Sequence, residues 1–317
     1  MSDHRTRIIF EREIYPSKEQ VANEDPKLSV LNLSYYPEER GPYNIVASEI
    51  GTDGKLTNPK QRWGGMMRKL DNTDFEKANI EYIEFWMMDP ALTNPDGYEG
   101  EMYINLGDIS EDILRDGKKS FEHGLPISNE DVGRTDSTMW GRVPKTTSTV
   151  TAFSNETGAR KKQDVGLNGL STEDEFLFTF NGTRPYKDYV DALRNTVSQA
   201  VLAEWMADPF SPLNDPAGDN FHYYRGTDFD EQEVPVLARY KHYNGTEGNS
   251  PATEDQTETY GTASTLSPDI EDINKDNTLN EYEKYFQYKV ILRPDMMEVG
   301  RQHITEKKVA KVTLRNG

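Results

Sequence analysis

Short apolar runs separated by turn-forming residues dominate the first third of the chain. Residues 28–35 and 43–47 are separated by proline and glycine, a punctuation that favours strands over helices. Residues 80–88 form a longer run that is rich in aromatic side chains, which predicts a central strand of a sheet. Residues 102–107 follow after a loop of Asn, Pro, Asp and Gly, so we expect the two runs to form a hairpin.

The periodicity changes in the second half of the chain. Apolar residues recur with the period of an α-helix over about residues 185–206, and an Asp-Pro pair follows them, which predicts one amphipathic helix. The polar stretches 207–232 and 241–268 predict long loops. A strand pattern returns at residues 285–292 and at 308–314. Strands on both sides of a helical insertion, without regular βαβ alternation, predict a mainly β, antiparallel β-sandwich with an α-helical and loop insertion.

Composition narrows the classes of function. The chain has 36 basic and 55 acidic residues among 317, a net charge of −19, and no cysteine. Thiolate metal sites, disulfides and cysteine nucleophiles are therefore excluded, and binding to nucleic acid or to an anionic bilayer is disfavoured. A mean hydropathy of −0.83 together with 10% aromatic residues predicts a folded core with long polar loops. Residues 1–12 are charged and contain no apolar h-region, and no run of about 18 apolar residues occurs, so we expect neither a signal peptide nor a spanning helix.

The sharpest local motif is a calcium-loop pattern at residues 272–283, which follows D-x-[DN]-x-[DN] with Glu at position twelve. It departs from the motif at Asn277, where Gly is expected, and Ser267-Pro268 leaves no entering helix. The alternative is a solvated acidic loop that attracts cations nonspecifically, with nine acids and one base over residues 254–283. The expected Ca²⁺ ligands are Asp272, Asn274, Asp276, Thr278 through its carbonyl, Asn280 directly or through water, and Glu283 as a bidentate carboxylate.

Catalytic patterns are weak by comparison. The five histidines have no zinc-binding spacing, and neither a phosphate loop nor a nucleophile elbow occurs. The acid pairs Glu81/Glu84 and Glu99/Glu101 could serve a glycosidase, yet such pairs arise by chance among 55 acids. We therefore expect no enzyme. Aromatic residues in predicted loops could stack on sugar rings, which leaves a glycan-binding surface module as an alternative; they are Tyr98, Trp140, Tyr223 and Tyr224.

Several motifs together resemble one family, from about residue 28 to the end. They lie at residues 39–44, 62–68, 79–90, 106–112, 116–122, 140–144, 164–170 and 269–283. These stretches resemble the SprA/Sov family of very large outer-membrane proteins of Bacteroidota. The resemblance implies a part of the translocon of the type IX secretion system, a giant β-barrel that exports gliding adhesins and hydrolases. The sequence ends at a hairpin-forming Asn-Gly pair with no returning strand, so we expect a piece of a longer protein.

The resemblance sharpens the predicted organisation. Residues 80–88 do not alternate as a barrel strand does, so we expect a soluble lobe attached to the barrel, at the outer membrane or cell surface. The resemblance, taken together with the predicted sandwich, suggests a jelly-roll similar to galactose-binding-like modules. The expected parts are an N-terminal extension at 1–27, the sandwich at 28–150, the insertion with its acidic calcium-loop-like segment at 151–283, and returning strands at 284–317.

The function that follows is noncatalytic, in structure, gating or partner docking. The implied partners are the rest of the translocon barrel, outer-membrane partner proteins and secreted cargo proteins, without nucleic acid and without a membrane span in this segment. Calcium, if bound, would order the acidic loop before the strand at 285–292. A glycan-binding surface module and a glycoside hydrolase are the competing functions, and the resemblance supplies no catalytic residues.

Overall fold

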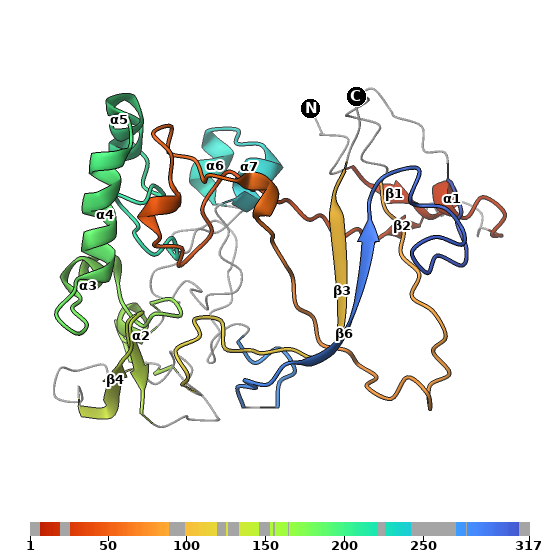
Figure 1. Cartoon of the computed structure of the whole chain (residues 1–317), viewed down its shortest axis with the longest axis horizontal. Coiled ribbons are helices and arrows are strands. Elements are labelled where there is room, and N and C mark those ends of the chain that lie inside the picture. Colours follow the sequence, from red (N-terminus) through yellow and green to blue (C-terminus); the bar gives the residue numbers. More distant parts are fainter. Residues whose placement is uncertain are drawn as a thin grey trace. The chain divides into compact units, whose positions relative to one another are not determined.

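The computed structural model divides the chain into two compact units, which are described separately (Figure 1). The ribbon unit comprises Met1–Ser34, Asn72–Asp108 and Glu283–Gly317, and the helical unit comprises Tyr35–Asp71 and Ile109–Tyr282. The structure describes residues 7–19, 26–88, 99–118, 125, 133–145, 153–154, 156–163, 165–220, 226–241, 271–276 and 278–310.

The ribbon unit is built on two long antiparallel strands. Strand β3 (Glu101–Asp108) pairs with β6 (Lys284–Ile291), with Glu101 opposite Ile291 and Asp108 opposite Lys284 (Figure 1). Gly107 lets the two backbones approach, because a Cβ at this position would lie 2.3 Å from the carbonyl oxygen of Lys284. The unit also contains α1 (Glu11–Ile14) and a short sheet of β1 (Ile9–Phe10) with β2 (Lys27–Leu28).

The helical unit is organised by two consecutive helices, α4 (Pro185–Thr196) and α5 (Gln199–Ala207). Between them, the N–H of Ser198 donates to the carbonyl of Thr52 at 2.8 Å, and the Ser198 hydroxyl accepts from the N–H of Val201. Ser198 thus caps a new helix instead of continuing the old one. The other elements are η2 (Ala47–Glu49), η3 (Pro59–Gln61), β4 (Thr135–Ser137), β5 (Arg142–Pro144), α2 (Arg160–Gln163), α3 (Thr172–Leu177), α6 (Thr227–Glu231) and α7 (Val236–Lys241).

The hydrophobic core lies in the helical unit and consists of two clusters that α4 joins. Tyr186 enters the first cluster, whereas Tyr189, Val190 and Leu193 enter the second. These residues recur three to four positions apart, so one stripe of the helix faces inward. The first cluster is Tyr43, Leu114, Leu167, Leu170, Phe178, Tyr186 and Ala217; the second is Ile50, Leu56, Tyr189, Val190, Leu193, Val197 and Leu213.

The predicted jelly-roll sandwich is wrong for this structure. Helix accounts for 22% and strand for 13% of the described residues, and these strands form two-stranded sheets only, three of them. A sandwich needs two larger sheets whose apolar faces pack together. The core forms instead around the predicted helical insertion, because a helix with an apolar stripe can bury it against neighbouring turns and short helices.

The central error concerns residues 80–88, which contain no strand and are all exposed. They were expected to pair with the strand at 102–107, but β3 takes β6 as its partner, where opposite charges meet across the register. The expected strands at 28–35 and 43–47 are also absent, apart from Leu28 in β2.

Other expectations concern strands, a helix and a loop elsewhere in the chain. The strands at 102–107 and 285–292 are confirmed, as β3 and β6. The helix at 185–206 is confirmed in place but is divided at Val197-Ser198. Of the predicted strand at 308–314, residues 308–310 are not in a strand and the rest lie outside the described residues, as does nearly all of the loop at 241–268. No helix within the described ranges has the length and apolarity needed to cross a bilayer.

Candidate functional site

The predicted calcium loop folds into a series of tight turns stabilised by its own side chains. The N–H of Asp276 donates to Oδ1 of Asp272 at 3.0 Å and to Oδ1 of Asn274 at 2.8 Å. Oδ1 of Asp276 accepts from the N–H and the hydroxyl of Thr278, at 2.9 and 2.6 Å. The hydroxyl bond is the main reason that the pKa of Asp276 is lowered. The structure therefore brings four of the six predicted ligands together.

The loop is anchored from inside by Glu111, a residue that the sequence analysis did not single out. Its Oε1 accepts from the N–H groups of Ile273 and Asn274, at 3.0 and 3.3 Å, and its Oε2 accepts from the N–H of Asn280 at 3.0 Å. In return, the N–H of Glu111 donates to the carbonyl of Asn280 at 2.7 Å. Burial raises the pKa of Glu111, against these hydrogen bonds, which lower it.

The remaining predicted ligands are held differently. Asn280 is fixed to Glu111, and Glu283 is exposed and makes no hydrogen bond to the other five within the described part of the chain. Among the described residues, no three His, Asp or Glu side chains gather in a way that could hold a metal ion. The predicted set also uses amide and carbonyl oxygens, and position 277 lies outside the described residues. The calcium site therefore stays a prediction.

The residues considered for sugar chemistry are mostly engaged elsewhere. Glu99 lies 3.3 Å from Arg293, and Glu101 forms a 2.5 Å ion pair with Lys289. The hydrogen bond from Lys289 is the main reason that the pKa of Glu101 is lowered, which suits an ion pair and not a general acid. Trp140 packs against the first core cluster, and the other candidate aromatics, Tyr98, Tyr223 and Tyr224, lie outside the described residues.

The carboxyl group of Glu175 lies fully buried in the core beside α4. Its Oε1 accepts from Nδ2 of Asn168 at 2.9 Å and its Oε2 from the N–H of Ala217 at 3.2 Å. Burial, aided by the charge of Asp215, raises the pKa of Glu175 to about 8. Sequence analysis missed this residue, because only the apolar Phe176 and Phe178 beside it distinguish it from exposed acids on the same helix.

Apolar side chains are divided unequally between the two units. Every buried hydrophobic residue of the described chain lies in the helical unit. In the ribbon unit, large apolar side chains are exposed instead, including seven of the nine residues at 80–88. Large exposed apolar patches of this kind mark surfaces that bind partners. The seven are Ile80, Tyr82, Ile83, Phe85, Trp86, Met87 and Met88.

The β3–β6 ribbon has one apolar and one polar face, because residues directly opposite each other share a face. The apolar face consists of the pairs Met102/Val290, Ile104/Tyr288 and Leu106/Phe286, with Phe286 76% and Tyr288 44% exposed. On the polar face, Gln287 donates to Asn105 at 3.0 Å and Lys289 lies over the ring of Tyr103.

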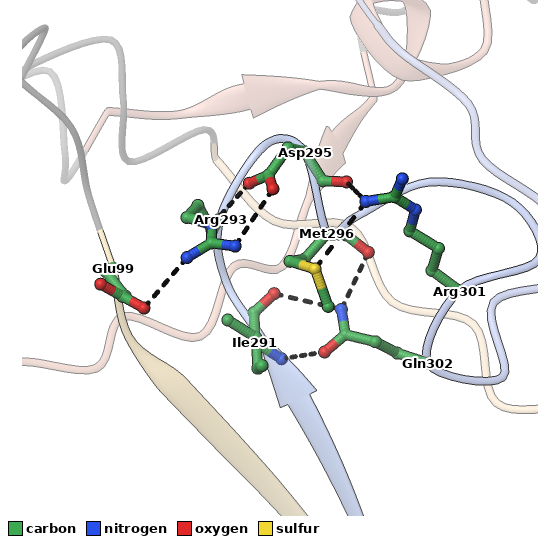
Figure 2. A network of polar contacts seen from close by, with 7 residues as sticks. All are labelled: Glu99, Ile291, Arg293, Asp295, Met296, Arg301 and Gln302. Carbon is green, nitrogen blue, oxygen red and sulfur yellow. Dashed lines mark hydrogen bonds and ion pairs between the residues drawn. The ribbon is translucent and has the colours of Figure 1, made fainter.

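A polar network closes the far end of β6 (Figure 2). Arg293 bonds both carboxylate oxygens of Asp295 and reaches Glu99, and Arg301 donates to the carbonyl of Asp295 at 2.7 Å. These contacts hold the turn after β6 so that the side-chain amide of Gln302 lies against Ile291. The ribbon therefore has an apolar face that could bind a partner, and the end of β6 at Ile291 is covered by Gln302.

A family model matches the C-terminal part of the chain. Residues 188–317, which contain most of α4 and all of α5, α6, α7 and β6, match the family model SprA_N, described as motility related/secretion protein. No curated protein matches the chain. The match associates the chain with a secretion system of the cell envelope. The match over residues 188–317 supports the resemblance to the SprA/Sov family that the sequence motifs indicated.

Proposed function

We propose that the chain is a noncatalytic domain of the type IX secretion translocon that docks partner proteins through its ribbon unit. The observation that carries this proposal is that every buried hydrophobic residue of the described chain lies in the helical unit, whereas the large apolar side chains at 80–88 in the ribbon unit are exposed. Burying apolar surface is the main favourable term in protein association. A partner could therefore bury exposed apolar surface of the ribbon unit, whereas the helical unit already has a hydrophobic core of its own.

The run at 80–88 is the strongest part of this surface. It is extended in sequence over nine residues, has no regular structure, and contacts Tyr15 through the ring of Trp86, with ring centroids 5.9 Å apart. Aromatic residues and methionine are enriched where protein interfaces are buried. The partners proposed are the remainder of the translocon barrel, other outer-membrane proteins and secreted cargo, at the outer membrane or cell surface.

The proposal is tested by substitution in the chromosomal gene that encodes the chain. Replacing Ile83, Phe85 and Trp86 together by serine should reduce both export of a reporter cargo and gliding, while the amount of the protein in the envelope stays unchanged. The matched control replaces Leu177 and Met206 by serine, since these residues of the helical unit are 70% and 74% exposed. Normal export in the first variant, at normal abundance, would contradict the proposal.

A photo-crosslinking experiment identifies the partner independently. An amino acid with a benzophenone side chain at Trp86 should crosslink to other translocon proteins or to cargo in intact cells. The same group at Met206 should give none of these products. If both positions crosslink to the same proteins, the ribbon unit is not the docking element.

A further inference from the structure

One hydrogen bond just beyond the β3–β6 ladder shows which backbone N–H and C=O groups of β3 point toward β6 and which point away from it. The N–H of Leu292 donates to the carbonyl of Gly100 at 2.7 Å, which extends the β3–β6 register by one hydrogen-bonded pair. Such pairs alternate with pairs that do not exchange backbone bonds in an antiparallel ladder. The N–H and C=O groups of Glu101, Tyr103, Asn105 and Gly107 therefore point away from β6.

The outer edge of β6 is capped by a side chain that imitates a strand. Oε1 of Gln302 accepts from the N–H of Ile291 at 2.6 Å, and its Nε2 donates to the carbonyl of the same residue at 3.3 Å (Figure 2). This is the pair of bonds that a neighbouring strand would form. Nε2 also donates to the carbonyl of Met296 at 2.9 Å, which fixes the amide in place. Strand addition at this end of β6 is blocked.

Among the described residues, none caps the outer edge of β3 in this way. Within the described ranges, no backbone hydrogen bond from outside the ladder reaches Glu101, Tyr103, Asn105 or Gly107. An uncapped row of backbone donors and acceptors is a template for another strand. The two edges thus differ at the Ile291 end, where Gln302 caps β6, whereas all four outward residues of β3 are uncapped within the described ranges; this difference favours β3.

The acidic residues of β3 indicate which kind of strand could pair with its outer edge. Apart from Tyr103, the ionisable side chains of β3 are the acids Glu101 and Asp108, at its two ends. On its paired side, β3 meets Lys284 opposite Asp108 and Lys289 beside Glu101, with Met102, Ile104 and Leu106 facing apolar residues. Two β3 edges paired antiparallel through their outward groups would place Glu101 opposite Gly107 of the other copy and Asp108 opposite Gly100. Neither acid would gain the basic neighbour that it has in β6, which disfavours a second copy as the occupant.

We propose that the open edge of β3 binds an extended strand of a partner polypeptide by β-strand addition. The bound strand has apolar residues at alternate positions and a lysine or arginine near each end, like β6 itself. Main-chain hydrogen bonds supply affinity in this mode of recognition, and the alternating side chains supply specificity. The proposal deepens the proposed function by naming the chemistry of the partner segment, and it rests on that function in taking the partner to be a protein.

The probe is the peptide Lys-Thr-Val-Thr-Val-Thr-Val-Lys, labelled with a fluorophore, and the readout is anisotropy with the whole 317-residue chain. We expect saturable binding. Asn105→Pro removes an outward N–H and the side-chain bond from Gln287 but keeps the backbone bonds between β3 and β6, so it should weaken binding on the order of tenfold, the size expected for one lost hydrogen bond with some distortion. The matched control is Gln287→Pro, which removes the outward N–H of the residue opposite and should bind as the unchanged protein does.

Two further peptides separate strand addition from simple adhesion. Replacing both lysines by glutamate should weaken binding, and N-methylation at alternate residues should abolish it, because the methyl groups block one edge of the peptide. Amide exchange of β3 and β6 in each variant checks that the ribbon persists. Absence of binding to the unchanged chain, equal binding by the Asn105→Pro variant, or equal binding of the methylated peptide would each overturn the proposal.

Sedimentation of the chain alone provides the last control. Self-association that Asn105→Pro abolishes would mean that a second copy occupies the edge, which also overturns the proposal. Failure of the proposed function can be distinguished from failure of the edge proposal, because the proposed function is tested by export in the variant with serine at Ile83, Phe85 and Trp86. Peptide binding with normal export would support the edge and contradict the docking role.

Discussion

Two buried carboxyl groups, Glu111 and Glu175, organise loops of the helical unit by accepting backbone N–H groups. Glu111 holds Ile273, Asn274 and Asn280 in one loop, and Glu175 holds Ala217 in another. Buried carboxyl groups are costly unless their oxygens are hydrogen-bonded, so each loop depends on its acid and each acid on its loop. At the residue scale, the role of these two acids is structural, because they hold the loops in place.

The raised pKa of Glu175 predicts that the helical unit loses stability as pH rises. Between about 4.5 and about 8 the folded protein keeps a proton that the unfolded chain releases. The stabilisation is complete below the unfolded pKa and is lost by about pH 8, with a slope of at most about 1.4 kcal/mol per pH unit. Urea unfolding between pH 5 and 8 measures this slope.

Substitution assigns the slope to this residue. Glu175→Gln is neutral at every pH and should flatten the pH dependence, even if one lost hydrogen bond lowers stability overall. Glu173→Gln, an exposed acid of the same helix, should leave the slope unchanged. An unchanged slope in Glu175→Gln would mean that other groups control the pH response.

The predicted calcium site is tested by thermal unfolding with EDTA and then with millimolar Ca²⁺. Binding to the folded state alone raises the melting temperature by mass action, and we expect no comparable rise with Mg²⁺. Replacing Asp272 and Asp276 by alanine should abolish the Ca²⁺ response. Asp112→Asn, outside the loop, is the control. An equal response in the double variant would locate the effect elsewhere, and no response in the unchanged chain would leave a solvated acidic loop.

At the scale of elements, the ribbon and the helix pair are fixed by different local devices. The register of β3 and β6 is set by opposite charges, with Asp108 facing Lys284 and Glu101 bonded to Lys289, and by the absence of a side chain at Gly107. Helix α4 ends where Val197 turns into the core and Ser198 starts α5. Each device involves one or two residues and determines the course of a whole element.

Gly107→Ala should therefore open the end of the ribbon. Gly107 has φ of 145°, and a Cβ there would collide with the backbone of Lys284. We expect a local destabilisation of about 1–3 kcal/mol, as for other strained backbone sites. Amide exchange of β6 should accelerate near Lys284, whereas Asn105→Ala should leave that end protected. Unchanged protection in Gly107→Ala would show that the ribbon can separate there without cost.

At the scale of the whole molecule, the two units have unequal means of stabilisation. The helical unit buries two clusters of apolar residues, whereas the described ribbon unit has no buried hydrophobic residue and rests on an eight-residue ladder. An isolated two-stranded ribbon is at best marginally stable in water. The ribbon unit is therefore the part whose order depends most on a partner.

Hydrogen exchange should reveal this difference directly. Amides of α4 near Leu193 should exchange only by global unfolding of the helical unit, and those of β3 and β6 should exchange much faster. Addition of the strand peptide should slow exchange in the ribbon and leave α4 unchanged. Equal protection of α4 and β3 in the free chain would contradict the unequal stability.

Much of the secondary structure could be predicted, and most of the tertiary arrangement could not. The strands at Glu101–Asp108 and Lys284–Ile291 and the helical stripe of α4 follow from periodicity, which is a local property. The partner of β3 could not be read from its neighbours, because residues 80–88 are closer in sequence and more apolar. Glu111 was missed for the same reason, since its loop lies more than 160 residues away.

What the sequence by itself determined is the resemblance to a family, the acidic character, the position of the main helix and the two long strands. These depend on motifs, composition and short-range periodicity. The tertiary structure alone decided which segments are buried, which strands pair, and which edge of the ribbon is left open. Burial and strand pairing depend on segments that are distant in the sequence. Here the opposite charges and Gly107 favour pairing of β3 with β6, and the apolar run at 80–88 stays exposed.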